Sequence, residues 1–256
     1  METQFFHINN KKLAYDDTGD GPLVICLPSL GDIRSEYRFM VPAGYRVVTM
    51  DLRGMGESSA HWSSYSVADM GADVLQLIHY LDAGPAVIVG TSKSAGSAVW
   101  AAVEEPDSVK GLILIGAVTR DIADIMPIWV AKLLFTLLFL PPWGRWIWKK
   151  YYPTLYPSQK RDDFQTYLEK LMANVKEPGR LASIRKMTTS SNQASGERLD
   201  KVQVPVEIIM GGKDPDFKDP EKEAIYLNGL LKGGNIISFQ VSAIIHIQKC
   251  LRLRIH

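Results

Sequence analysis

A serine lies in a run of small residues that follows a short apolar segment. Residues 89–96 read VGTSKSAG. A serine on a sharp turn from a strand into a helix presents its hydroxyl above the sheet, and such a turn needs small residues two places before and two places after the serine. Gly90 and Ser94 meet this need, although glycine is the usual residue at the second place. Ser92 is therefore a candidate nucleophile. The alternative is a plain tight turn in a domain without catalytic activity.

Three further motifs follow apolar runs in the same way. Residues 27–32 read LPSLGD, residues 51–58 read DLRGMGES, and residues 211–214 read GGKD. If each run is a strand of a parallel sheet, all of these motifs lie at the carboxyl ends of strands, where open parallel sheets build their sites.

The elements that would position these motifs alternate along the chain. Short β-branched runs predict strands buried on both faces. Apolar residues at helical spacing predict a helix over residues 67–81, with Ser66 and Asp69 as its capping pair, and a second helix over about 220–231. This alternation is typical of an α/β fold with a mostly parallel sheet. The predicted strands cover residues 23–27, 45–50, 86–90, 111–115, 204–210 and 236–241.

Taken together, these motifs resemble the α/β-hydrolase family, in its branch with a helical cap. The DxRGxGxS pattern ahead of GxSxS carries the resemblance. It implies an α/β fold with a doubly wound sheet of the α/β-hydrolase type. It also implies core segments at 1–120 and 198–256, the second one incomplete, and a helical cap at 121–197.

The resemblance also implies roles for individual residues. Ser92 matches the nucleophile, and Asp214 matches the acid of the catalytic triad, with Asp216 as a nearby substitute. The backbone amides of Leu30 and Lys93 match the two donors of the oxyanion hole. A serine hydroxyl needs a histidine to accept its proton, and that histidine needs a carboxylate to hold its tautomer. This chemistry requires no metal and no organic cofactor.

The histidine of the triad is expected at His246, close to the family's position after the last strand. No glycine precedes His246, and neither glutamate nor proline follows it. Regrouping the bases that encode residues 242–251 permits a Gly-His segment followed by glutamate and proline. The hypothesis that follows is a C-terminus read out of frame, which sequencing of the coding DNA tests.

Several other polar residues are expected to be structural. Asp51 is expected to anchor its loop and Arg53 to form an ion pair. The side chain of Lys93 is expected to point into solvent, and Cys26 to be a small core residue. Structural or exposed positions are expected for His7, His61 and His79.

Composition limits the class of protein. The 256 residues are 46% hydrophobic and 22% charged, with a formal net charge of +1, which gives no overall electrostatic footprint for nucleic acid or for an anionic membrane. Two cysteines cannot form a disulfide framework, and no spacing suits a zinc site. The first residues do not resemble a signal peptide, so a cytoplasmic location is expected.

One apolar run is a candidate for a membrane span. Residues 128–140 are too few for a span, which needs roughly 20 apolar residues, and they include Lys132. A weak contact with a membrane surface stays open, because Trp143, Trp146 and Trp148 follow among basic residues.

The leading hypothesis is a serine hydrolase that acts through an acyl-enzyme on an ester, or on an amide or a carbon–carbon bond next to a carbonyl. The aromatic and aliphatic residues of 121–197 predict a small or medium apolar substrate. The alternative is a catalytically impaired protein of the same fold that binds an apolar small molecule. The sequence does not indicate an oligomeric state.

Overall fold

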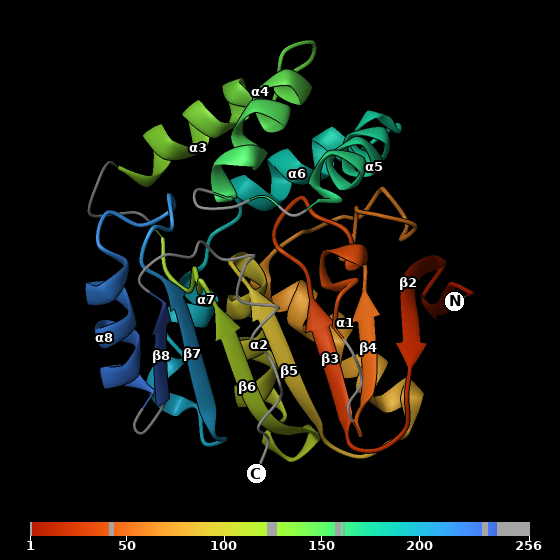
Figure 1. Cartoon of the computed structure of the whole chain (residues 1–256), viewed down its shortest axis with the longest axis vertical. Coiled ribbons are helices and arrows are strands. Elements are labelled where there is room, and N and C mark those ends of the chain that lie inside the picture. Colours follow the sequence, from red (N-terminus) through yellow and green to blue (C-terminus); the bar gives the residue numbers. More distant parts are fainter. Residues whose placement is uncertain are drawn as a thin grey trace.

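A computed structural model describes residues 2–40, 44–121, 127–156, 160, 162–231 and 235–239. Within them the chain forms one eight-stranded sheet in the order β1-β2-β4-β3-β5-β6-β7-β8 (Figure 1). The strands from β4 to β8 in this order run parallel, and β1 and β2 form an antiparallel edge. The strands are β1 (Gln4–Ile8), β2 (Lys11–Thr18), β3 (Leu23–Leu27), β4 (Arg46–Met50), β5 (Ala86–Thr91), β6 (Val109–Ile115), β7 (Val206–Gly211) and β8 (Asn235–Phe239).

Helices connect the parallel strands. The described α-helices are α1 (Val67–Leu81), α2 (Lys93–Glu104), α3 (Ile128–Leu138), α4 (Gly144–Tyr151), α5 (Phe164–Lys176), α6 (Arg180–Thr189), α7 (Gln193–Gly196) and α8 (Pro220–Leu230). The 3-10 helices are η1 (Arg34–Tyr37), η2 (Pro106–Ser108), η3 (Tyr152–Leu155) and η4 (Leu199–Lys201).

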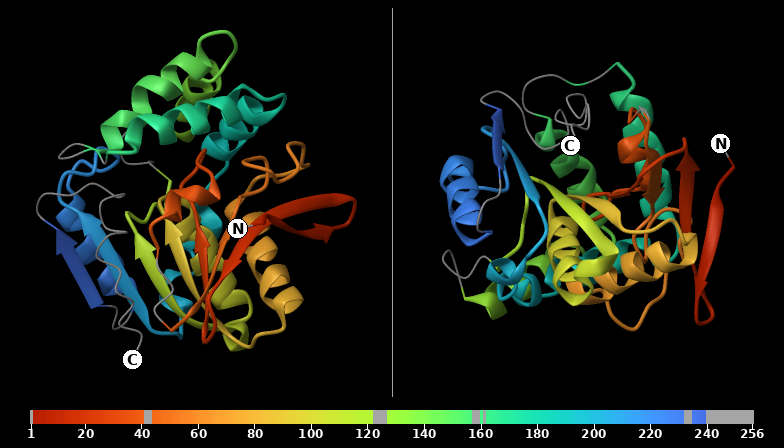
Figure 2. Two further views of the ribbon diagram at one scale, coloured as in Figure 1. Left: turned by 45° about the vertical axis from the view of Figure 1, so that its right-hand side comes forward. Right: turned by 90° about the horizontal axis from the view of Figure 1, so that it is seen from below.

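The strands are buried on both faces, as their continuous apolar runs predict. Ile25, Ile88 and Leu114 point to one face, where they pack with side chains of α1, α2 and α8. These three helices lie along the same side of the sheet (Figure 2). The alternate residues Cys26 and Val89 point to the other face. The sheet is therefore a packed layer whose carboxyl edge is free to carry loops.

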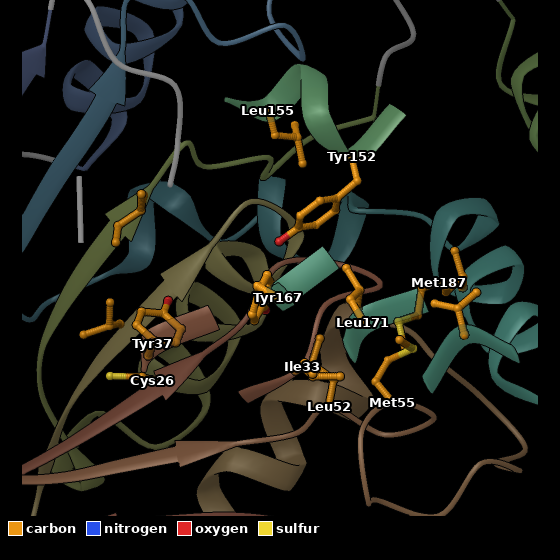
Figure 3. Close-up of a cluster of buried hydrophobic side chains, with 14 of the residues drawn as sticks. Cys26, Ile33, Tyr37, Leu52, Met55, Tyr152, Leu155, Tyr167, Leu171 and Met187 are labelled. Atoms are coloured by element: carbon orange, nitrogen blue, oxygen red, sulfur yellow. The ribbon is translucent and has the colours of Figure 1, made fainter. Parts of the chain in front are cut away.

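Helices α3 to α6 form a layer above that carboxyl edge (Figure 1). We call these helices, with η3, the helical layer. Its apolar side chains continue the core of the sheet without a break, because Tyr152, Tyr167 and Leu171 share one buried cluster with Cys26 and Tyr37 (Figure 3).

The predicted elements agree with the structure in type and closely in extent. The strand over 23–27 and the helix over 67–81 have the predicted bounds. The predicted capping pair is confirmed as a capping box, in which the Ser66 hydroxyl accepts from the Asp69 amide and the Asp69 carboxylate accepts from the Ser66 amide. The antiparallel pairing of β1 with β2 was not predicted.

Candidate active site

Ser92 lies in the turn between β5 and α2 with a backbone conformation that side chains rarely adopt. Its φ is 55° and its ψ is −123°, and it is one of three non-glycine residues with positive φ in the described chain. A Cβ added at Gly90 would lie 2.7 Å from the Ser94 carbonyl oxygen, so the turn tolerates no side chain there. The backbone at Ser92 is held in a strained state that surrounding structure must enforce, which is a common feature of functional sites.

Ser94 links the turn to the loop after β3. Its hydroxyl is fully buried and donates to the carbonyl oxygen of Pro28, at 2.5 Å. The serine that replaces the usual glycine therefore fits the turn and adds a hydrogen bond between two loops of the carboxyl edge.

The two amides matched to the oxyanion hole lie on these two loops. Lys93 is the first residue of α2, and amides in the first turn of a helix have no partner within the helix. Leu30 follows Ser29 on the loop after β3, where Gly31 has a φ of +75°. A Cβ at Gly31 would lie 2.5 Å from the ring of Trp148, so the helical layer closes directly over this loop.

A buried carboxyl group fixes the loop that carries Leu30. Glu36 is 1% exposed and accepts hydrogen bonds from the Ser29 amide at 2.6 Å and from the Ser29 hydroxyl at 3.0 Å. Burial raises the pKa of Glu36 well above its usual range, and the neighbouring charge of Asp32 raises it further. Ser29, the residue just before the matched oxyanion donor Leu30, is thus fixed by the side chain of Glu36.

Asp32 joins the same loop to the helical layer. It is fully buried and accepts from the hydroxyl of Tyr152 at 2.5 Å, from the hydroxyl of Tyr167, and from the amide of Ile33 at 2.8 Å. Burial raises its pKa to about 6, against the lowering effect of these donors. Tyr152 and Tyr167 extend from the helical layer toward the sheet (Figure 3).

Neither Glu36 nor the two tyrosines were singled out from sequence. Glu36 lies close to Asp32 in the chain, but the tyrosines are 120 and 135 residues from Asp32. The available signal in the sequence was the pair of carboxyl groups, Asp32 and Glu36, on one loop. Tyr152 and Tyr167, the hydrogen-bond partners of Asp32, are distant in the sequence and are identified only by the fold.

The expectation that the Lys93 side chain points into solvent is wrong. Lys93 is 5% exposed, and its ammonium group donates to the Asn192 side-chain oxygen at 2.6 Å and to the Ser190 carbonyl at 2.9 Å. Burial lowers its pKa to about 8, with the charge of Asp121 acting in the opposite direction. The chain returning from the helical layer covers this side chain, and no sequence pattern indicates that contact.

Asp214 lies just past the carboxyl end of β7. It is 3% exposed, and one carboxylate oxygen accepts from the Asp216 amide at 3.0 Å. The other oxygen is buried and has no hydrogen-bond partner among the described residues. Burial raises the pKa of Asp214 to about 7. Its carboxylate thus keeps one acceptor position for a donor.

Asp216, the substitute considered from sequence, is otherwise engaged. It accepts from the hydroxyl of Tyr151 at 2.5 Å. Tyr151 ends α4, so this hydrogen bond ties the loop after β7 to the helical layer. Of the two aspartates, Asp214 is the one whose second oxygen is buried without a hydrogen-bond partner among the described residues.

The carboxyl edge gathers Ser92, Lys93, Leu30 and Asp214 from three loops. Strands β5 and β7 are separated by β6 alone, so a strand spacing of ~4.8 Å places their ends about 10 Å apart. His246 lies outside the described residues. Of the other histidines, His79 is exposed on α1 and faces Glu105 at 2.8 Å.

Asp51 and Arg53 form structural contacts, as expected. Asp51 accepts from the amides of Arg34 and Glu57, at 2.7 and 2.9 Å. Arg53 pairs with the buried carboxylate of Asp73 through two hydrogen bonds of 2.7 and 2.8 Å. Both side chains shape the loop after β4.

Two kinds of site are absent from the described residues. No group of three or more His, Cys, Asp or Glu side chains there is arranged to hold a metal ion. No helix in that part of the chain has the length and apolar character to cross a membrane.

Comparison with known proteins agrees with the fold and the motifs. The sequence profile of the alpha/beta hydrolase fold family matches residues 22–225. Since this is most of the chain, the protein belongs to the α/β-hydrolase family.

Individual relatives give the degree of similarity. A putative non-heme bromoperoxidase of Mycobacterium tuberculosis is 36% identical over 107 residues, which span 40% of this chain and 40% of the relative. A bromoperoxidase structure from Bacillus anthracis has a TM-score of 0.82 at 18% identity, covering 97% of this chain and 95% of that one. An enol-lactonase structure from Burkholderia xenovorans has a TM-score of 0.80 at 19% identity, covering 96% and 95%. These two structural likenesses show the shared fold.

Proposed function

We propose that the protein is a serine hydrolase that cleaves an ester through an acyl-enzyme formed on Ser92. The observation that carries this proposal is the conformation of Ser92, a half-buried serine held at φ 55° directly before the first turn of α2. Such a turn sets the hydroxyl apart from its own backbone and beside the free amides of a helix N-terminus.

In the proposed mechanism, the Ser92 hydroxyl attacks the ester carbonyl. The ester C–O bond then breaks and the alcohol leaves with the proton taken from Ser92, and water hydrolyses the acyl-enzyme to release the acid and restore the serine. The amides of Lys93 and Leu30 stabilise the negative oxygen that develops, and each such donor typically contributes ~3 kcal/mol to the transition state. The hydrogen bonds from Ser29 to Glu36 and from Ser94 to Pro28 support this role, because they fix the two loops that carry these amides.

A base must remove the proton from Ser92. His246 is the proposed base, and Asp214 is proposed to accept a hydrogen bond from its imidazole and so hold the correct tautomer. The buried and unpartnered oxygen of Asp214 among the described residues supports this assignment.

The proposed substrate is a small or medium apolar ester. The helical layer is rich in aromatic and aliphatic side chains, among them Tyr156, Phe164 and Leu171 of its buried cluster, and apolar surroundings favour apolar groups. The likeness in fold to an enol-lactonase is compatible with an ester or lactone substrate. Amides and carbon–carbon bonds next to a carbonyl remain within the same chemistry.

A panel of p-nitrophenyl esters of increasing acyl length tests the activity, with Ser92→Ala as the inactive variant. Ser97→Ala is the matched control, because Ser97 is a buried serine of α2 whose hydroxyl has no partner among the described residues. We expect hydrolysis to be lost in the first variant and kept in the second. Equal hydrolysis by wild type and Ser92→Ala rejects Ser92 as the nucleophile.

A fluorophosphonate probe separates the hydrolase from a binding protein of the same fold. An activated serine reacts covalently with such a probe, whereas an unactivated one does not. Labelling of Ser92, located by peptide mass, supports the hydrolase. Binding of an apolar ligand without labelling supports the catalytically impaired alternative.

A further inference from the structure

Large apolar side chains are exposed mainly at one place on the molecule. Ten such side chains are exposed among the described residues, and six of them belong to α3, α4 or the segment that joins the two helices. Both helices belong to the helical layer, beyond the carboxyl edge of the sheet (Figure 1). The six are Trp129, Leu133, Leu134, Leu137, Trp143 and Trp146.

These side chains form stripes along the helices. Trp129, Leu133 and Leu137 are four residues apart on α3 and therefore share one face. Ala131, on the opposite face, is buried. The indole nitrogen of Trp143 donates to the carbonyl oxygen of Leu137 at 2.9 Å, which joins the end of α3 to the start of α4. These exposed apolar side chains lie on α3, on α4 and on the segment between the two helices, and we call them together the α3–α4 surface.

The charges on this surface are all of one sign. Residues 128–151 contain four exposed basic side chains and no aspartate or glutamate, in a chain whose net charge is +1. The ammonium group of Lys150 lies 5.8 Å from the ring of Trp146. The four are Lys132, Arg145, Lys149 and Lys150.

We propose that the α3–α4 surface binds to the interface of an anionic lipid bilayer. Exposed tryptophan and leucine side chains insert at the level of the lipid headgroups, and flanking lysine and arginine side chains attract anionic lipids. An exposed apolar area could also bind another protein or a second copy of the chain, so the positive charge of the surface is the observation that favours an anionic bilayer. A second copy of the chain would bring the same four positive charges to the contact, and like charges face to face oppose association. This inference does not depend on the proposed hydrolase activity.

Sedimentation with vesicles measures this binding. The full chain is mixed with vesicles of phosphatidylcholine alone or of phosphatidylcholine with phosphatidylglycerol, and the bound fraction is followed against lipid concentration. We expect binding to the anionic vesicles, weaker binding at high salt, and little binding to the neutral vesicles. Tryptophan fluorescence should shift to shorter wavelength on binding, because Trp129, Trp143 and Trp146 leave water.

Two pairs of variants separate the apolar from the charged contribution. Trp129→Ser with Trp146→Ser removes exposed rings, and should weaken binding by at least about tenfold. Its control is Ile225→Ser, because Ile225 is 59% exposed on α8.

Lys149→Gln with Lys150→Gln should weaken binding about thirtyfold, since each basic residue near an anionic surface contributes a roughly fivefold gain. Its control is Lys110→Gln with Lys201→Gln, two exposed lysines outside the helical layer.

Three outcomes overturn the proposal. The first is no binding of the wild-type chain to anionic vesicles. The second is equal loss of binding in the α3–α4 variants and in their controls. The third is a concentration-dependent dimer that Trp129→Ser with Trp146→Ser abolishes while vesicle binding is absent, which would assign the surface to contact between copies.

Discussion

Ser92 and Lys93 are adjacent residues, but the residues that fix their surroundings lie at different distances along the chain. The conformation of Ser92 depends on its close neighbours, because Gly90 and Ser94 leave room for the turn. A spacing rule therefore predicted it. The environment of the Lys93 side chain depends on Asn192, which is 99 residues away. No local pattern contains that information, and the sequence-based expectation for this side chain was wrong for that reason.

Glu36 offers a test of positioning at the scale of one residue. We expect Glu36→Leu to lower kcat for ester hydrolysis about 10- to 100-fold with little change in KM, because the Leu30 amide loses its fixed place and acts mainly in the transition state. Glu36→Gln should keep most of the activity. The side-chain oxygen of glutamine can still accept from the Ser29 amide, as the Glu36 oxygen does at 2.6 Å.

Steady-state kinetics of the two variants, with urea midpoints measured alongside, checks this prediction. Equal kcat values in two folded variants would show that Glu36 does not position the loop. A rise in KM alone would place Glu36 in substrate binding instead.

At the scale of elements, the hydrophobic periodicity of the sequence predicted the strands and helices in which one burial pattern continues from end to end. The strand over 23–27 is buried at every position, and the helix over 67–81 buries one face and carries its own capping box. The β1–β2 edge was harder to predict. Its strands mix exposed with buried residues, and its antiparallel pairing with β4 depends on a partner distant in sequence.

The connection between β3 and β4 shows the same distinction. The sequence has only seven residues between Tyr37 and Tyr45. In the described part of this connection the chain forms η1, a single 3-10 turn over Arg34–Tyr37. This turn carries Glu36 and so contributes to the candidate site.

Two glycines test how the turn between β5 and α2 is built. We expect Gly90→Ala to lower the free energy of unfolding by about 1–3 kcal/mol, because its Cβ would meet backbone atoms of Ser94 and Ala95 that cannot move away. Gly229→Ala in α8 should instead stabilise by up to ~1 kcal/mol, because nothing lies within 4 Å and alanine favours the helix.

Urea unfolding of the two variants gives both changes. The rate of fluorophosphonate labelling should also fall in Gly90→Ala and stay unchanged in Gly229→Ala. Stability and labelling like wild type in Gly90→Ala would mean that the turn is not as tight as the structure has it.

At the scale of the whole molecule, the helical layer and the sheet are joined by polar contacts as well as by a shared core. Asn174 on α5 accepts from the Gly56 amide at 3.0 Å and donates to the Gly56 carbonyl at 2.9 Å. Arg38 pairs with Asp163 at 2.6 Å. Asp32 is the most buried of these connections, because it takes two hydroxyl groups of the helical layer into the interior. The folding of the two parts is therefore expected to be coupled.

Asp32 makes that coupling depend on pH. Burial raises its pKa to about 6 in the folded protein, whereas the ordinary value is 3.8. Between these values the folded state holds a proton that the unfolded state has released, so this group makes the free energy of unfolding fall as the pH rises from about 4 to about 6. Above that window its contribution is constant. Asp32→Asn does not titrate. Tyr152 and Tyr167 donate to different oxygens of Asp32, so the amide keeps an acceptor for one of the two hydroxyls and offers its NH2 group as a donor to the other. The urea midpoint of this variant should gain on that of wild type as the pH rises through this window. A constant difference between Asp32→Asn and wild type would mean that the buried carboxyl group does not retain its proton, and that the contact between the sheet and the helical layer does not respond to pH through this residue.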